Sequence, residues 1–413
     1  MKQQTIGVQR INYLLSGKQI LLAGLLLLCV LPVCAQDTIP GFAKGFIHKL
    51  AVEFRPEYVF PTHRFITGNE KGMSTHLKYM FQFRPESEAG RLFGTAYQGA
   101  GLGFFHVGND KELGTPVSLY LFQGAPITRL NPRLTLDYDW EFGVSLGWNP
   151  YHKATNPQNV IIGSSVNFYI NVGVYFTWEL SRYFDGSLGA TATHFSNGNT
   201  HFPNAGLNTT GLRLGLAYNF NRIPQNGGTG SGNLLPPFPR HISYDLTLFG
   251  AWRRTGVDVG DKRFAAPHTY GVAGFMFAPM YNFNYRLRAG LSLDGTYDAG
   301  TGLIAEDSGE EGQDSDDSFA LHAPPVAKQL SLGVSARAEY TMPYFTVGLG
   351  MGRNLIAHAE KQSWYQLLYL KVDLLRSTYL HLGYRLQEFR HPNHLILGIG
   401  YRFHNKYPKI RRK

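Results

Sequence analysis

The sequence predicts an all-β protein, a transmembrane antiparallel β-barrel, and three observations support that prediction. The N-terminus resembles an export signal, whereas no later segment is long and apolar enough for a membrane-spanning helix. The 413 residues include 47 Gly, 24 Tyr and 28 Phe, which are high counts typical of barrel strands and their aromatic girdles. Segments of about ten residues with alternating apolar and polar side chains recur along the chain. Composition alone leaves a secreted β-sandwich open as the alternative.

Residues 1–35 have the three parts of a signal peptide. Lys2, Arg10 and Lys18 precede an apolar run from Ile20 to Leu31, and Val33-Cys34-Ala35 supplies the small residues before a cleavage site. We expect this segment to be removed on export. Both cysteines of the chain lie in it, so the mature protein would have no disulfide and no thiol chemistry.

The positive charge of the chain does not indicate a nucleic-acid partner. The formal net charge is +10, and the basic residues are spread along the sequence apart from a basic tail at 406–413. An exported barrel meets anionic lipid headgroups, which attract such charge. We therefore expect outer-membrane lipids as partners and no nucleic acid, and the oligomeric state stays open.

Alternation by parity defines about sixteen candidate strands. In Leu134 to Phe142, apolar and charged residues fall on opposite faces, with Asp137, Asp139 and Glu141 together on the polar face. In a barrel that face lines the lumen, where we expect these carboxylates to pair with basic residues. The candidate strands begin near residues 46, 73, 97, 114, 131, 161, 183, 208, 240, 268, 283, 328, 343, 362, 377 and 392.

The strands divide into two sets of about eight, at 36–222 and 240–405. Between them, residues 223–239 are rich in Gly and Pro and predict a linker; they lack the Gly-Lys-Ser/Thr ending of a phosphate loop. Both sets close on a similar strand, at 212–220 and 395–403, each alternating apolar and polar residues up to an aromatic. Two tandem barrels and one larger barrel both fit this pattern.

The stretch from His194 to Asn208 is the candidate site. In an extended strand, His194 and Ser196 point the same way, roughly 7 Å apart along the chain. An imidazole beside a hydroxyl is the minimum for an activated serine nucleophile. The same face carries Leu188, and Asn208 shares the apolar parity of the strand after the loop. If the apolar row faces lipid, all three polar residues lie at the lipid-facing surface, where an enzyme acting on acyl chains needs them.

The first half resembles the outer-membrane lipid A 3-O-deacylases, a family of eight-stranded barrels with a catalytic His-x-Ser on a late strand. The resemblance rests on His194-Phe195-Ser196-Asn197, on Pro203-Asn204-x-Gly206, on Ile162 to Tyr169 and on the closing strand to Phe220, and it covers roughly residues 45–222. The second half has only the general pattern of a barrel. The resemblance implies Ser196 as nucleophile and His194 as base. It also implies Asn197 and Asn204 as candidates for the oxyanion pocket, with Gly198 in support.

One position departs from that family. Where the deacylases have a glutamate as third triad member, this chain has Asn208. The outer-membrane phospholipases A use His-x-Ser-Asn-Gly with an asparagine at the matching distance, and His194 to Gly198 with Asn208 is similar to that pattern too. An asparagine can orient the histidine, although it stabilises the imidazolium less than a carboxylate does. No cofactor or metal is expected for a deacylase, whereas a phospholipase-like enzyme would bring Ca²⁺.

The sequence therefore favours a serine esterase of the outer membrane of a Gram-negative bacterium, removing an acyl chain from lipid A. A phospholipase A acting on glycerophospholipids is the first alternative. The second is a non-enzymatic porin-like or structural barrel, in which His194 and Ser196 are rim residues without a catalytic role.

Overall fold

In the computed structural model, two closed eight-stranded antiparallel barrels follow one another along the chain. The structure describes residues 46–60, 71–222, 237–254, 256–259, 262–266, 268–307, 319–357, 363–389 and 391–407. The expected signal peptide, most of the linker and most of the basic tail lie outside these residues. None of the helices in the described ranges has the length and hydropathy needed to cross a membrane.

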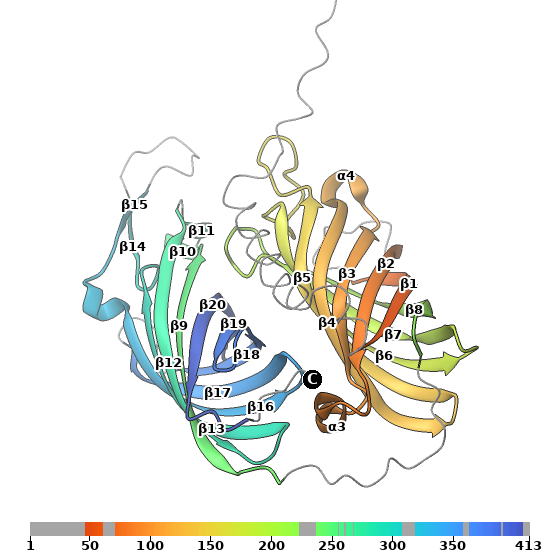
Figure 1. The fold of residues 1–413 in the computed structure, drawn as a ribbon. Coiled ribbons are helices and arrows are strands. Elements are labelled where there is room, and N and C mark those ends of the chain that lie inside the picture. Colours follow the sequence, from red (N-terminus) through yellow and green to blue (C-terminus); the bar gives the residue numbers. More distant parts are fainter. Residues whose placement is uncertain are drawn as a thin grey trace, which may run out of the picture. The chain divides into compact units, whose positions relative to one another are not determined.

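Barrel 1 runs in simple up-and-down order (Figure 1). Its strands are β1 (Phe46–Val59), β2 (Lys71–Phe83), β3 (Tyr97–His106), β4 (Gly114–Asn131), β5 (Leu134–Trp148), β6 (Val166–Glu179), β7 (Phe184–Ser196) and β8 (Leu207–Asn219). Pairing of β1 with β8, from Lys49 opposite Asn219 to Val59 opposite Thr209, closes it. Two short helices, α3 (Glu88–Phe93) and α4 (Asp110–Leu113), lie in its connections.

Barrel 2 closes separately by pairing β20 with β9, for example Ile399 with Leu248. Its strands are β9 (His241–Arg253), β12 (Tyr270–Asn282), β13 (Leu287–Asp298), β16 (Leu330–Thr341), β17 (Phe345–Ala357), β18 (Trp364–Asp373), β19 (Thr378–Gln387) and β20 (His391–Phe403). Two hairpins extend its connections, β10 (Gly256–Val259) with β11 (Lys262–Ala265) and β14 (Ile304–Asp307) with β15 (Phe319–His322), and η2 (Val326–Gln329) precedes β16. Of the two architectures that the sequence left open, the chain thus adopts tandem barrels.

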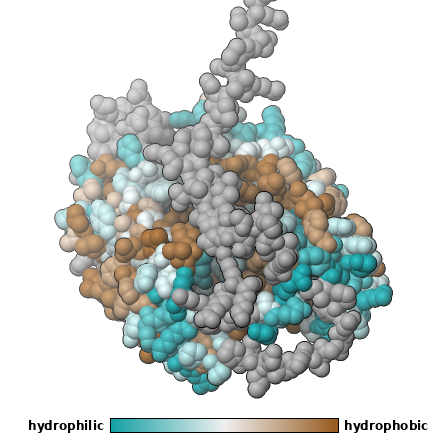
Figure 2. Space-filling model, viewed as in Figure 1, coloured by the Kyte–Doolittle hydropathy of each residue, from teal (hydrophilic) through white to brown (hydrophobic). Residues whose placement is uncertain are grey.

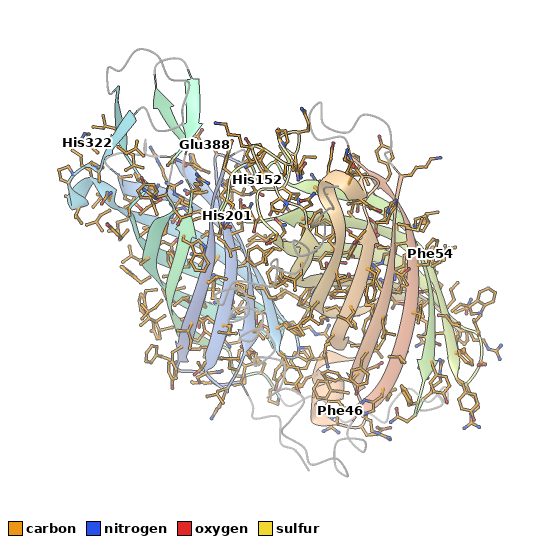
Figure 3. The ribbon with its side chains drawn as sticks, turned by 90° about the horizontal axis from the view of Figure 1, so that it is seen from above. Phe46, Phe54, His152, His201, His322 and Glu388 are labelled. Carbon is orange, nitrogen blue, oxygen red and sulfur yellow. The ribbon has the colours of Figure 1, made fainter. Side chains whose placement is uncertain are left out.

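The outer faces of the strands are apolar. Leu188 and Leu212, on neighbouring strands, expose 53% and 58% of their surfaces, and Phe54 lies on the outer surface of β1 (Figure 3). Figure 2 shows hydrophobic surface in brown beside hydrophilic areas on one face of the molecule. Because apolar residues exposed in such rows are the mark of a lipid-facing barrel wall, the prediction of a transmembrane barrel is confirmed.

The lumen of barrel 1 is filled by a charge network. Arg55 is fully buried, and its guanidinium forms ion pairs of 2.6 Å with Glu53 and with Glu141. Lys78 bridges Glu141 and Asp139 at 2.8 and 2.9 Å. The expected pairing of the lumen carboxylates is therefore confirmed for these two. Asp137 differs, since within the described residues it forms no ion pair and accepts a hydrogen bond from Thr135.

Barrel 2 also contains a buried network of ion pairs, formed by other residues. Asp245 forms ion pairs with Arg288 at 2.9 Å, with Lys371 at 2.7 Å and with Arg402 at 3.1 Å. Glycines on β17 make room for large side chains of β18. A Cβ on Gly348 would collide with the ring of Tyr369. Close packing therefore explains why glycine recurs at every second position of β17, at 348, 350 and 352.

Candidate active site

The site lies on the outer face of β7, at the end where β7 and β8 are joined by residues 197–206. The side chains of β7 alternate as an outward-facing row requires. Thr193 and Phe195 are buried inside barrel 1, whereas His194 and Ser196, which alternate with them, are partly exposed. The predicted parity of His194 and Ser196, on the same face as Leu188, agrees with this exposure pattern. His201, in the connecting loop, and Phe46, at the start of β1, lie at opposite ends of the barrel (Figure 3).

Strand pairing brings Asn208 to the histidine. In the register of β7 with β8, His194 lies directly opposite Asn208. Nδ1 of His194 is 2.8 Å from Oδ1 of Asn208. Since an amide oxygen can only accept, Nδ1 carries the proton, and the other ring nitrogen, Nε2, is left to accept one. The fold thus brings together a histidine and the asparagine that the sequence singled out as its partner.

Ser196 is the last residue of β7 and lies opposite Phe168 of β6. Among the described residues, no hydrogen bond joins its hydroxyl to the ring of His194. Catalytic hydrogen bonds often form only when substrate is bound, and the two side chains occupy successive positions of one row. The structure therefore places the proposed nucleophile and base as neighbours on one face without the contact already made.

Two asparagines hold the loop that follows Ser196. The backbone N–H of Asn197 donates to Oδ1 of Asn204 at 3.1 Å, and Nδ2 of Asn197 donates to the carbonyl of His201 at 3.0 Å. Nδ2 of Asn204 donates to Oδ1 of Asn199 at 3.1 Å. The side-chain amides of Asn197 and Asn204 thus form hydrogen bonds within the loop and stabilise its conformation. These bonds limit their freedom to bind an oxyanion.

Gly198 offers a different donor. Its φ of +65° is a left-handed conformation that glycine adopts without a steric penalty. Within the part of the chain that the structure describes, its backbone N–H has no hydrogen-bond partner. Backbone N–H groups are common donors in oxyanion pockets. Gly198 therefore offers a backbone donor that no described residue uses.

A segment that the sequence misassigned supports this loop. We expected a strand from residue 161, but β6 begins at Val166. The reason is local, because the backbone N–H groups of Ile161 and Ile162 donate to Oδ1 of Asn159, at 3.1 and 3.0 Å, instead of joining a strand ladder. Both isoleucines are fully buried. The Asn-x-Ile-Ile spacing was the available signal for this turn.

No metal site accompanies the histidine and serine in the described residues, where no three His, Cys, Asp or Glu side chains are grouped to bind a metal ion. Asn208 and Asn204 supply neutral amide oxygens, and both oxygens are engaged by His194 and the loop. The expectation of Ca²⁺ for a phospholipase-like enzyme therefore stays a prediction.

Two family models match the chain. The model described as lipid A 3-O-deacylase (PagL) matches residues 122–217, which include β5, β6, β7, most of β8 and the whole candidate site. The model described as acyloxyacyl hydrolase, C-terminal domain, matches residues 242–405, nearly all of barrel 2. Together they cover well over half of the chain, and both belong to the same enzyme family. No curated protein matches the chain.

Solved structures of outer-membrane barrels match this chain with low sequence identity and low TM-scores. The crystal structure of the outer membrane enzyme PagL is 19% identical over 40% of this chain and 97% of its own, with a TM-score of 0.26. BamA from Haemophilus ducreyi is 10% identical over 86% and 70% of the two chains, with a TM-score of 0.19. The COG4313 outer membrane channel from Pseudomonas putida F1 is 11% identical over 87% and 95%, with a TM-score of 0.19. None of these likenesses is close enough to indicate a function.

Proposed function

The chain belongs to the lipid A 3-O-deacylase (PagL) family of outer-membrane enzymes, and from this premise we propose that barrel 1 is a serine esterase that removes an acyl chain from lipid A. The observation that carries the proposal is the His194–Asn208 hydrogen bond of 2.8 Å on the outer face of β7, with Ser196 next in the same row. An ester at the lipid–water boundary reaches this face without leaving the membrane.

The reaction begins with proton transfer. Nε2 of His194 takes the proton of Ser196 as Oγ attacks the carbonyl carbon of the acyl ester. The carbonyl oxygen becomes negatively charged in the tetrahedral intermediate, and the N–H of Gly198 donates to it. Asn208 holds Nδ1 throughout, which fixes the tautomer and orients the ring.

The second half of the reaction reverses these roles. The imidazolium of His194 returns its proton to the leaving sugar oxygen, which departs as a hydroxyl and leaves the acyl group on Ser196 as an ester. Water then attacks that ester with His194 again as base, which releases a free fatty acid and restores the serine. No metal or cofactor takes part in these steps.

The test is the lipid composition of cells that produce this chain. Mass spectrometry of lipid A should show loss of one ester-linked acyl chain with the wild type and not with Ser196→Ala. Ser187→Ala is the matched control, because Ser187 lies on the same strand but has the opposite parity. Unchanged lipid A with the wild type, or full deacylation with Ser196→Ala, contradicts the proposal.

One observation favours a second candidate, a phospholipase A. The partner of His194 is an asparagine, as in the outer-membrane phospholipases, and not the glutamate of the deacylases. The same lipid extracts distinguish the two. A phospholipase leaves lysophospholipid and intact lipid A, and addition of Ca²⁺ to the purified enzyme raises its rate.

A further inference from the structure

Gly206 lies against the ring of His194. A Cβ placed on Gly206 would be 2.9 Å from Cε1 and 3.7 Å from Nε2 of the imidazole, and 3.2 Å from the carbonyl oxygen of Phe195. The first distance is shorter than real Cβ contacts allow, so a side chain here displaces the ring. The φ of Gly206 is +74°, in the left-handed region that glycine favours. Because Gly206 has no side chain, the imidazole of His194 can occupy its observed position.

The backbone of Gly206 is held in place by the segment 159–163. Its N–H donates to the carbonyl of Ile161 at 3.4 Å. Ile161 is fully buried, and Asn159 fixes its backbone through the turn described above. Two residues further on, Gly163 touches the backbone of Phe202 and Pro203 so closely that a Cβ would collide with both. The segment 159–163 thus supports the loop at two points, one of them at Gly206.

We propose that Gly206 is a positioning residue for the catalytic base. Asn208 holds the imidazole by its Nδ1 edge, and Gly206, two residues earlier, bounds the edge formed by Cε1 and Nε2. Nε2 is the atom that takes the serine proton, so the position of this edge decides how well His194 and Ser196 align. The inference rests on the proposed function and adds a residue outside the histidine, serine and asparagine.

The effect belongs to the chemical step and not to substrate binding. A displacement of about 1 Å in a catalytic group can cost about 100-fold in rate. We therefore expect Gly206→Ala to lower kcat by at least about tenfold with little change in KM for a soluble ester in detergent micelles. The dependence of kcat/KM on pH should also change, because the displaced ring loses its alignment with Asn208.

Gly147→Ala is the matched control. Gly147 has a φ of +88° in the same barrel, and a Cβ there meets nothing closer than 3.4 Å. It tests backbone strain without contact to a histidine and should keep kcat near the wild type. Gly206→Asn distinguishes backbone strain from the collision of a Cβ with His194. Asparagine tolerates a positive φ, so it adds little strain, yet it carries the Cβ. It should fold even where alanine does not, and should also have low kcat.

Coupling to His194 distinguishes positioning from general damage. In a His194→Ala background, Gly206→Ala should lower the residual rate no further, because there is no ring to displace. Wild-type kcat in folded Gly206→Asn, or an equal loss in both backgrounds, overturns the inference. Full activity of His194→Ala would instead overturn the proposed function, so the two failures are distinguishable. Heat-modifiable mobility checks folding of each variant.

Discussion

Nδ1 of His194 lies 2.8 Å from Oδ1 of Asn208, and the two residues face each other directly across the β7–β8 pair. The partner of the proposed base is therefore a neutral amide. It can fix the tautomer and orientation of the ring but does not offset the charge that the imidazolium gains. This pairing gives a triad in which orientation and charge stabilisation can be tested separately.

The first prediction concerns Asn208. Asn208→Ala removes the acceptor for Nδ1 but not the nucleophile, so activity should fall steeply without vanishing. Asn208→Glu supplies a carboxylate acceptor that stabilises the imidazolium, and it should keep measurable activity, far above that of the alanine variant. Initial rates on purified lipid A measure both. Equal rates for Asn208→Ala and the wild type would remove this residue from the site.

The second prediction treats Ser196 and His194 as one unit. Ser196→Ala and His194→Ala should each reduce ester hydrolysis to a low residual rate, and the double variant should be little worse than either single one. All three should keep heat-modifiable mobility, because both side chains lie on the outer face and form no part of the buried network. Losses that multiply in the double variant would show that the two residues act independently.

The third prediction is that barrel 1 functions alone. The β1–β8 pairing closes the barrel, so it needs no further edge partner. Residues 36–222 should fold in detergent and retain esterase activity, measured against the full chain at equal concentration. Recovery of aggregate alone, under conditions in which the full chain folds, would show that barrel 2 is required for barrel 1 to form.

The fourth prediction concerns the lumen of barrel 1. Arg55→Met leaves Glu53 and Glu141 without one of their buried partners, and loss of one partner in such a network costs about 3–5 kcal/mol. The free energy of unfolding in urea and lipid micelles should fall by that order. Lys49→Met is the control, because Lys49 pairs with Asp185 nearer to solvent, and a loss of under about 1 kcal/mol is expected. Equal losses would mean that burial does not strengthen the network.

Some features follow from the sequence because they depend on local periodicity. Alternation of side chains between two faces is a property of every extended strand, so strand parity placed His194, Ser196 and Asn208 on one surface. The same parity assigned Asp139 and Glu141 to the lumen, where the structure shows their ion pairs. The resemblance to the deacylases likewise rested on short motifs, each of which is local in the sequence, between Ile162 and Phe220.

Other features depended on contacts between segments that are far apart in sequence. The alternation of apolar and polar residues is the same in one large barrel and in two small ones, and only the pairing of β1 with β8 and of β20 with β9 separated them. The strand expected near residue 161 begins only at Val166, because the side chain of Asn159 accepts hydrogen bonds from the backbone N–H groups of Ile161 and Ile162, which apolar periodicity does not report.

In the candidate site, too, some features follow from the sequence and others depend on the tertiary structure. Residue types and spacing determined which side chains share the outer face, since a strand fixes the direction of each residue from its neighbour. The tertiary structure alone decided that His194 meets Asn208 in register, that Asn197 and Asn204 hold their own loop, and that Gly206 bounds the imidazole. The physical reason is that register, loop hydrogen bonds and close approach are set by all partners at once, whereas the direction of a side chain along a strand is set by the backbone beside it.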